Sequence, residues 1–254
     1  MLSQVSEQND FLSRLSAADY EALSPDLMPM TLSVGAYVYR AGGPVSEVVF
    51  PRSGLVVMRM RVGDQSGAGI VLIGRDGVVA GMLSAASAPA LCDAVVLVAG
   101  DGLRMPAAAF RQALEARPGI RSLATRFSAA MIAQAQQTAS CAMTHSVEKR
   151  LSRWFLEIAD RTGTADVPLL QSELAEIIGV QRTTVNFAVG QLERVGAIIS
   201  GRGRVRIADR PKLEGTSCEC YGRLKAYVAG LVPAVAVTKV AVGCVPAEKF
   251  QVNA

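Results

Sequence analysis

The chain has 254 residues, of which half are apolar, 5% are aromatic and 19% are charged, and its formal net charge is +4. This composition excludes disordered and fibrous proteins, and the length allows one or two domains with hydrophobic cores. Because His145 is the only histidine, metal sites with two or more histidines are excluded, and a Ser-His-Asp triad would have to use that residue. We therefore expect a protein that is not an enzyme.

The sequence contains no targeting or membrane signal. No apolar run reaches the roughly 18 residues that a membrane helix needs, and the N-terminus lacks the basic and then apolar pattern of a signal peptide. We expect a cytoplasmic protein that does not contact a membrane. The five cysteines, at positions 92, 141, 218, 220 and 244, are odd in number and widely spaced, so we expect free thiols rather than disulfides.

The first third of the chain is expected to be briefly helical and then rich in strands. Residues 9–27 have apolar residues at the spacing of short amphipathic helical turns. Residues 31–106 contain short β-branched runs separated by turn residues about every ten positions, which predicts an antiparallel barrel or sandwich. The gaps are too short for the crossover helices of a parallel sheet. The predicted strands are Ala36–Tyr39, Val48–Phe50, Leu55–Met60, Ile70–Ile73, Val78–Val79 and Val95–Ala99.

Two helices are expected after this region. Residues 106–115 are Ala-rich and predict a short helix, which Pro118-Gly119 separates from the next one. Residues 120–141 contain neither Pro nor Gly and predict one long helix. Its apolar stripe either covers a core or pairs with a second copy of the chain, and the near-heptad spacing favours pairing. The stripe consists of Ile120, Leu123, Ala124, Phe127, Met131, Ala135 and Thr138.

Three further helices are predicted between residues 144 and 192. Residues 144–161 have one apolar face, and Ser146 can cap the N-terminus of this helix. After a turn-rich loop, residues 170–178 and 185–192 carry two apolar stripes joined by Gly179-Val180-Gln181. Two short helices joined by a tight, glycine-containing turn are typical of a helix-turn-helix, whose second helix presents its outer face to the DNA major groove.

A β-hairpin is predicted directly after the second of these short helices. Residues 198–200 and 205–207 are mostly apolar and flank Gly201-Arg202-Gly203, where glycine allows the positive φ of a tight turn. Arg204 and Arg206 alternate with apolar residues and can contact phosphates from one face of the hairpin. The helix-turn-helix and the hairpin together predict a winged helix.

The positive charge of the chain is concentrated in the same region. Residues 180–212 contain seven basic and two acidic side chains, a local net charge of +5, whereas the other 221 residues contain 19 basic and 20 acidic ones. In composition alone, this cluster is equally typical of a solvated surface and of a surface that binds a polyanion. Combined with the winged helix, it favours DNA binding.

Several segments match a pattern known from one family. They are residues 170–186 (LQSELAEIIGVQRTTVN), 192–193 and 196–199 (GAII), then Val34-Gly35, Gly42, residues 48–51 (VVFP) and Ser53-Gly54, and finally residues 145–154 (HSVEKRLSRW). The first set resembles the DNA-binding domain of the Crp/Fnr superfamily of bacterial transcription regulators. The second set resembles its β-roll sensor domain, and the last segment resembles the connection between its dimer helix and its DNA-binding domain.

The resemblance implies an α+β fold with four parts. An antiparallel, cyclic-nucleotide-binding-like β-roll would occupy residues 1–117, a long dimerisation helix residues 118–143 and a winged helix-turn-helix residues 144–212, with a C-terminal tail at 213–254. The resemblance also implies a homodimer that binds a palindromic operator on double-stranded DNA and contacts RNA polymerase. A signal at the β-roll would move the dimer helix and a hinge at residues 144–146.

The expected DNA contacts lie on the helix-turn-helix and on the hairpin. Many members of the family carry Glu and Arg at the positions of Thr183 and Phe187, so the operator sequence is not implied. The residues expected to contact DNA are Gln171, Ser172, Gln181, Arg182, Thr183, Thr184, Asn186, Arg202 and Arg204.

The family members that bind cyclic nucleotides share a Glu and an Arg that bind the phosphate of the ligand. The sensor segment of this chain lacks both. Met82 stands where they carry Glu, and no arginine lies between Arg75 and Arg104, so a buried phosphate would have no charged partner. An Fnr-type iron–sulfur cluster needs cysteines near the N-terminus, and none precedes Cys92. The sensor segment also has no histidine for a haem. We identify no cofactor and expect a different small-molecule or redox effector.

Two smaller signals receive an ordinary interpretation. Cys218 and Cys220 are separated by one residue and are expected to be free thiols rather than a redox pair or half of a metal site. His145 is expected to form hydrogen bonds at the hinge rather than to bind a metal, so no metal site is predicted. The alternative to a DNA-binding regulator is a ligand- or redox-sensing module that acts through protein partners and uses its winged helix as an interaction surface.

Overall fold

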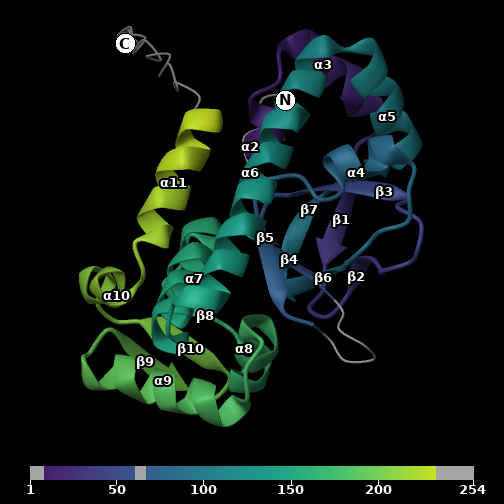
Figure 1. Cartoon of the computed structure of the whole chain (residues 1–254). Coiled ribbons are helices and arrows are strands. Elements are labelled where there is room, and N and C mark those ends of the chain that lie inside the picture. Colours follow the sequence, from purple (N-terminus) through teal and green to yellow (C-terminus); the bar gives the residue numbers. More distant parts are fainter. Residues whose placement is uncertain (1–8, 61–66, 233–254) are drawn as a thin grey trace, which may run out of the picture.

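The computed structural model describes residues 9–60 and 67–232, in which a β-roll lies beside a long helix, α6, and a winged helix lies near the end of that helix (Figure 1). The chain begins with α2 (Asp10–Ser13), α3 (Ala17–Leu23) and a 3-10 turn, η1 (Ser24–Asp26). Asn9 caps α2 by accepting hydrogen bonds from the backbone N–H groups of Phe11 and Leu12. The helical turns predicted for residues 9–27 are thus present.

Two antiparallel sheets form the β-roll, as the sequence predicts. One has the order β1-β7-β3 and the other the order β2-β6-β4-β5. The short helix α4 (Gly81–Ala86) lies between β5 and β6. Val79, part of the predicted strand 78–79, forms only an isolated bridge with Val49. The strands are β1 (Met28–Leu32), β2 (Tyr37–Tyr39), β3 (Glu47–Pro51), β4 (Leu55–Arg59), β5 (Gly69–Ile73), β6 (Asp93–Val98) and β7 (Gly100–Pro106).

The long helix uses its predicted stripe for the core of its own chain. After α5 (Ala107–Ala116), α6 (Pro118–Thr144) begins with Pro118 in its first turn and ends at His145. Ile120, Ala124 and Phe127 are buried in a cluster with the N-terminal helices and the β-roll. The residues of the stripe therefore cover a core, and the expectation that this stripe pairs with a second copy is wrong.

The winged helix contains a three-helix unit and a small sheet. Ser146 caps α7 (Val147–Thr162) as predicted, and α8 (Gln171–Ile178) and α9 (Arg182–Arg194) follow. The hairpin of β9 (Ile198–Gly201) and β10 (Arg204–Ile207), which we call the wing, extends into a three-stranded sheet by pairing with β8 (Asp166–Val167). These are the elements that place the candidate DNA contacts.

The described part of the predicted C-terminal tail is helical. It contains α10 (Arg210–Thr216) and α11 (Cys220–Leu231), and α11 lies beside the second half of α6 (Figure 1). The apolar stretch expected at residues 231–245 lies almost entirely outside the described residues. None of the helices that the structure describes is long and apolar enough to cross a membrane.

The β-roll and the winged helix share one apolar cluster. Leu55, Val57 and Leu72 of the sheet β2-β6-β4-β5 pack in the same cluster as Trp154 of α7 and Ile177 of α8. The two units approach closely at Gly69, since a Cβ atom there would lie 2.8 Å from the Trp154 ring and 3.1 Å from Ile177. The sheet β2-β6-β4-β5 and the helix-turn-helix therefore pack directly against each other.

Candidate nucleic-acid interface

A tight turn orients α8 and α9. Gly179 ends α8 with φ +72°, a conformation that glycine adopts without a steric penalty. Its N–H donates to the carbonyl of Ala175, and the N–H of Val180 donates to the same carbonyl. Gln181 then precedes the first turn of α9 in an extended conformation. The predicted turn at residues 179–181 is therefore the connection of a helix-turn-helix.

The helix α9 buries one face and exposes the other, as the sequence predicts. Val185, Ala188, Val189 and Leu192 are buried beneath it. The predicted contact residues on the opposite face, Gln181, Arg182, Thr183, Thr184 and Asn186, are all exposed. Because they gather at the N-terminal end, they lie where a recognition helix reaches the base edges.

Phe187 is a candidate contact that sequence reasoning did not include. This aromatic side chain is 70% exposed on the same face of α9 as Asn186. A single exposed apolar residue is common on protein surfaces, so Phe187 is a candidate because of its place beside the predicted DNA contacts and not because it is exposed. Its place among hydrogen-bonding residues in the sequence is the signal that could have identified it. It can make the apolar contact that a thymine methyl group offers.

The wing stands beside α9 with its arginines exposed. Arg204 and Arg206 are exposed, whereas Val205 and Ile207 are buried, which is the alternation expected of a half-buried strand. Gly203 has φ +75° in the turn. The Glu193 carboxylate of α9 accepts hydrogen bonds from the backbone N–H and the hydroxyl of Ser200, both at 2.7 Å. These bonds fix the wing against the recognition helix.

One groove brings five of the predicted residues together. It runs between the start of α8, the start of α9 and the wing. The other four predicted contacts, Gln181, Thr183, Thr184 and Asn186, do not line this groove but lie on the exposed face of α9. The predicted residues that line the groove are Gln171, Ser172, Arg182, Arg202 and Arg204.

The basic residues of this region fall into two groups. Arg210 and Lys212 form ion pairs, with Asp160 at 2.6 Å and with Asp209 at 3.4 Å respectively. Within residues 9–60 and 67–232, no acidic side chain forms an ion pair with Arg182, Arg202, Arg204 or Arg206. All four arginines of the second group are exposed, and Arg182, Arg202 and Arg204 line the groove, so they are available to bind phosphate.

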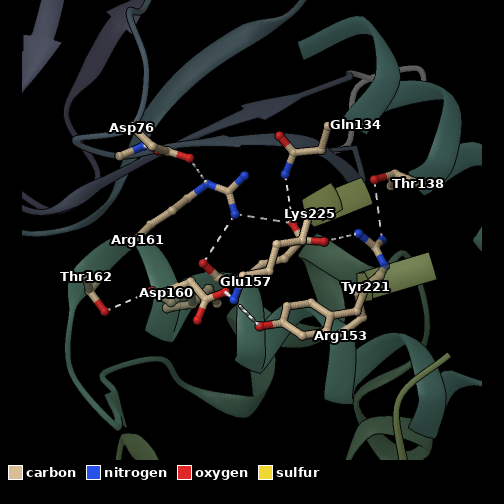
Figure 2. Close-up of polar contacts among 12 residues, drawn as sticks. Asp76, Gln134, Thr138, Arg153, Glu157, Asp160, Arg161, Thr162, Tyr221 and Lys225 are labelled. Atoms are coloured by element: carbon tan, nitrogen blue, oxygen red, sulfur yellow. Dashed lines mark hydrogen bonds and ion pairs between the residues drawn. The ribbon is translucent and has the colours of Figure 1, made fainter. Parts of the chain in front are cut away.

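A buried polar network connects the winged helix to the rest of the chain, and Figure 2 shows it. Glu157 of α7 accepts from Arg153 at 2.5 Å and from Gln134 of α6 at 2.8 Å. Arg161 lies 3.5 Å from the same carboxylate and 3.1 Å from Asp76 in the loop after β5. Arg153 is 1% exposed. No pattern in the sequence indicates that these charges are buried.

Asp160 organises a second group on the same helix (Figure 2). Tyr221 donates to it at 2.7 Å, Arg210 at 2.6 Å and Lys225 at 3.1 Å. Burial opposes its ionisation, but these three hydrogen bonds hold the pKa of Asp160 below its usual range. Asp160 therefore joins α7 to α10 and α11 as a carboxylate at neutral pH.

The segment that would hold a cyclic nucleotide has no charged group of its own. Residues 81–86 form α4, whose residue 82 is Met. Arg111 of α5 donates from Nε to the Ser84 carbonyl at 3.0 Å, so its guanidinium is engaged in holding α4 in place.

The family model of the Crp-like helix-turn-helix domain matches residues 149–216. No curated protein sequence matches the chain. Among solved structures, a Crp/Fnr-family transcriptional regulator from Eubacterium rectale is 15% identical, with a TM-score of 0.64 over 80% of this chain and 95% of that one.

Two further solved structures have the same fold. FixK2 from Bradyrhizobium japonicum is 16% identical, with a TM-score of 0.62 over 76% of this chain and 98% of that one. The c-di-GMP-responsive global regulator CLP of Xanthomonas campestris is 14% identical, with a TM-score of 0.64 over 76% of this chain and all of that one. At these identities the likeness establishes the fold.

Proposed function

We propose that this protein is a transcription regulator that binds a two-fold symmetric operator as a homodimer. The resemblance to the Crp/Fnr superfamily supports this proposal, because the Crp-like helix-turn-helix model matches residues 149–216 and a Crp/Fnr-family structure shares the fold over 80% of the chain. The observation that carries the proposal is the exposed polar face of α9 beside a groove lined by arginines without acidic partners.

The residues divide into two roles in this proposal. Gln181, Arg182 and Asn186 read base edges, because amide and guanidinium groups form paired hydrogen bonds with adenine and guanine in the major groove. Thr183 and Thr184 are exposed at the same end of the helix, and their hydroxyl groups add hydrogen bonds to neighbouring bases. Gln171 and Ser172, at the start of α8, and Arg202 and Arg204, on the wing, contact phosphates and fix the register on the duplex.

The homodimer uses a face of α6 that its own chain leaves open. Ile132 is 59% exposed and Met143 is 82% exposed, and Thr125, Gln136 and Ala139 are exposed with them. These residues recur at intervals of three, four and seven, which is the spacing of a seam between two helices. Pairing through this face would set two copies of α9 on successive major grooves.

Signal transfer uses the direct packing of the β-roll on the winged helix. A change at the sheet β2-β6-β4-β5 would move α7 and α8 through Trp154 and Ile177 and through the Arg59–Glu176 ion pair at 3.2 Å. The hinge at residues 144–146 then alters the spacing of the recognition helices. The effector is a small molecule or an oxidant other than a conventionally bound cyclic nucleotide. RNA polymerase is the expected partner on the promoter.

The proposal is tested by measuring the affinity of the full chain for random duplex DNA as a function of salt. A DNA-binding regulator loses affinity steeply as salt is added. The logarithm of its binding constant falls with the logarithm of the salt concentration, with a slope of about −0.9 for each phosphate contacted. Footprinting on the region upstream of its own gene, with and without a thiol oxidant, would then locate the operator. A flat salt response would contradict DNA binding and favour a module that acts through protein partners.

A further inference from the structure

Three cysteines and the only histidine of the chain converge where α6 ends and α11 begins. Cys141 lies in the last turn of α6, and His145 is the residue that follows this helix. Cys218 and Cys220 come after the winged helix in the sequence, around the start of α11. The Cys141 and Cys218 sulfurs are 3.9 Å apart, and Cys220 Sγ is 3.8 Å from His145 Nδ1. All four ligand atoms lie within 4.8 Å of one another.

The cluster is enclosed and contains no disulfide. Cys141, Cys218 and Cys220 are exposed by 0%, 2% and 4% and form a cluster apart from the three apolar ones. All three are free thiols. Buried cysteines in a core ordinarily pack against aliphatic and aromatic side chains. Here they face one another and an imidazole.

These distances match those of a tetrahedral zinc ion. Zn–S bonds of about 2.3 Å and Zn–N bonds of about 2.0 Å place two tetrahedral ligands roughly 3.5–3.8 Å apart. Two of the contacts are within about 0.3 Å of this spacing, and the remaining ones require a shift of at most about 1.3 Å. We propose that Cys141, His145, Cys218 and Cys220 bind one Zn²⁺ ion in a closed, structural Cys₃His site.

The neighbouring groups orient the ligands for this purpose. His145 turns Nδ1 toward Cys220, and its Nε2 lies 3.5 Å from the Glu219 carboxylate. A carboxylate behind a ligating imidazole fixes its tautomer and its orientation. The Gln137 side-chain amide donates to Cys220 Sγ at 2.9 Å. Three thiolates and Zn²⁺ carry a net charge of −1, and the buried Arg153 interacts electrostatically with Cys141 and Cys218.

The site links the residues on either side of the winged helix, His145 before it and Cys218 and Cys220 after it, to Cys141 of the long helix. With four protein ligands the zinc has no open position for a substrate, so its role is structural. It fastens the end of α6 to the start of α11 across the hinge at residues 144–146. The consequence for DNA binding rests on the proposed function, whereas the zinc site itself does not.

The experiment measures metal content and metal affinity of the full chain. The protein is purified with a thiol reductant, stripped with a chelator and titrated with Zn²⁺ or Co²⁺ alone. We expect one Zn²⁺ per chain after dialysis, and a tetrahedral Co²⁺ spectrum with thiolate charge-transfer bands. Cys141→Ser and Cys218→Ser should each lose more than 90% of the bound zinc. Cys92→Ser removes a buried cysteine of the β-roll and should retain the zinc.

A milder variant covers the case in which the cysteine variants do not fold. Glu219 is 65% exposed, and Glu219→Gln keeps the ligands and the packing intact. Loss of the carboxylate behind the histidine should weaken Zn²⁺ binding by about 10–100-fold. The proposal is overturned if the reduced wild-type chain binds less than one-tenth of an equivalent of Zn²⁺. It is also overturned if Cys92→Ser loses as much zinc as Cys141→Ser, or if mass spectrometry finds a Cys141–Cys218 disulfide in anaerobically prepared protein. Zinc binding without DNA binding would support the site and contradict only the proposed function.

Discussion

Arg182 and Arg204 line the same groove but differ in their elements, and this difference predicts different effects on DNA binding. Arg182 opens the recognition helix, so Arg182→Ala should reduce discrimination at one base pair by about 1–3 kcal/mol. Arg204 lies on the wing, so Arg204→Ala should weaken binding to all sequences alike and lower the salt slope by about one phosphate contact. Competition binding with operator and random duplexes at several salt concentrations measures both effects.

Arg194→Ala is the matched control for these two variants. Arg194 is an exposed arginine at the far end of α9, where it donates to Gln191. Its removal should leave both discrimination and the salt slope close to the wild-type values. If Arg182→Ala lowers the affinity for operator and random DNA by the same factor, its role in base reading is wrong.

Glu157 is the residue on which the buried network depends. Glu157→Gln removes the negative charge that faces Arg153 and Arg161 and leaves Arg153, which is 1% exposed, without its counter-ion. Removal of one partner of a buried ion pair costs about 3–5 kcal/mol. Urea unfolding should show a loss of this order. Glu115→Gln, on the exposed end of α5, should change the free energy of unfolding by less than about 0.5 kcal/mol. If both variants lose the same free energy of unfolding, the buried ion pairs of Glu157 do not contribute to stability.

Residue-scale features differ in how far sequence can predict them. The exposed contacts on α9 follow from helical periodicity, because Val185, Val189 and Leu192 must be buried. The Glu157 network does not follow, since charged residues at i and i+4 on a helix ordinarily face solvent. The cysteine and histidine cluster was missed for another reason. Cys141 and Cys218 are 77 positions apart, and only the packing of α11 beside α6 brings them together.

At the scale of elements, the strands predicted correctly are those with an apolar, β-branched sequence of their own. The runs at residues 48–50, 55–60 and 70–73 became β3, β4 and β5 because they are β-branched and bounded by turn residues. β1 and β7 were missed, because MPMTL contains Pro and GDGLRMP contains two glycines and two charges. These strands pair with each other from Met28 opposite Arg104 to Leu32 opposite Gly100. Their partner, rather than their own propensity, makes them strands.

The contact between β5 and α7 yields a prediction with an intrinsic probe. Trp154 is the only tryptophan and is 3% exposed beneath Gly69. Gly69→Val would place its Cβ 2.8 Å from the Trp154 ring, so the sheet and the helix must separate or repack, at a cost of about 1–3 kcal/mol. The fluorescence emission of Trp154 should shift to longer wavelength as water reaches the ring. Gly215→Ala fills open space in α10 and should leave the emission unchanged. An unshifted spectrum in a folded Gly69→Val variant would contradict the close packing.

At the scale of the whole molecule, the long helix was predicted correctly, but its apolar stripe covers a core of its own chain, which is the alternative that the near-heptad spacing did not favour. Periodicity shows that a helix has an apolar stripe, but it does not show whether the stripe meets its own chain or a second copy. Phe127 belongs to the predicted stripe and is packed among Phe11 and Phe110, with ring centroids 5.3 Å apart for the Phe11–Phe127 pair. If the chain forms the proposed homodimer through α6, the open face for it is therefore the opposite, less apolar one, which carries Ile132 and Met143.

This assignment predicts which substitution separates the dimer. Ile132→Glu places a charge on each of two facing helices, and burying unpaired like charges is strongly unfavourable. We expect the wild-type chain to be a dimer by light scattering and Ile132→Glu to be a folded monomer whose affinity for a two-half-site duplex falls to that of a single half-site. Leu91→Glu alters a side chain that is 79% exposed in the loop before β6, away from α6, and should remain dimeric. A dimeric Ile132→Glu variant would show that the two chains meet elsewhere, and the two-fold spacing of the recognition helices would then have to be set by a different surface.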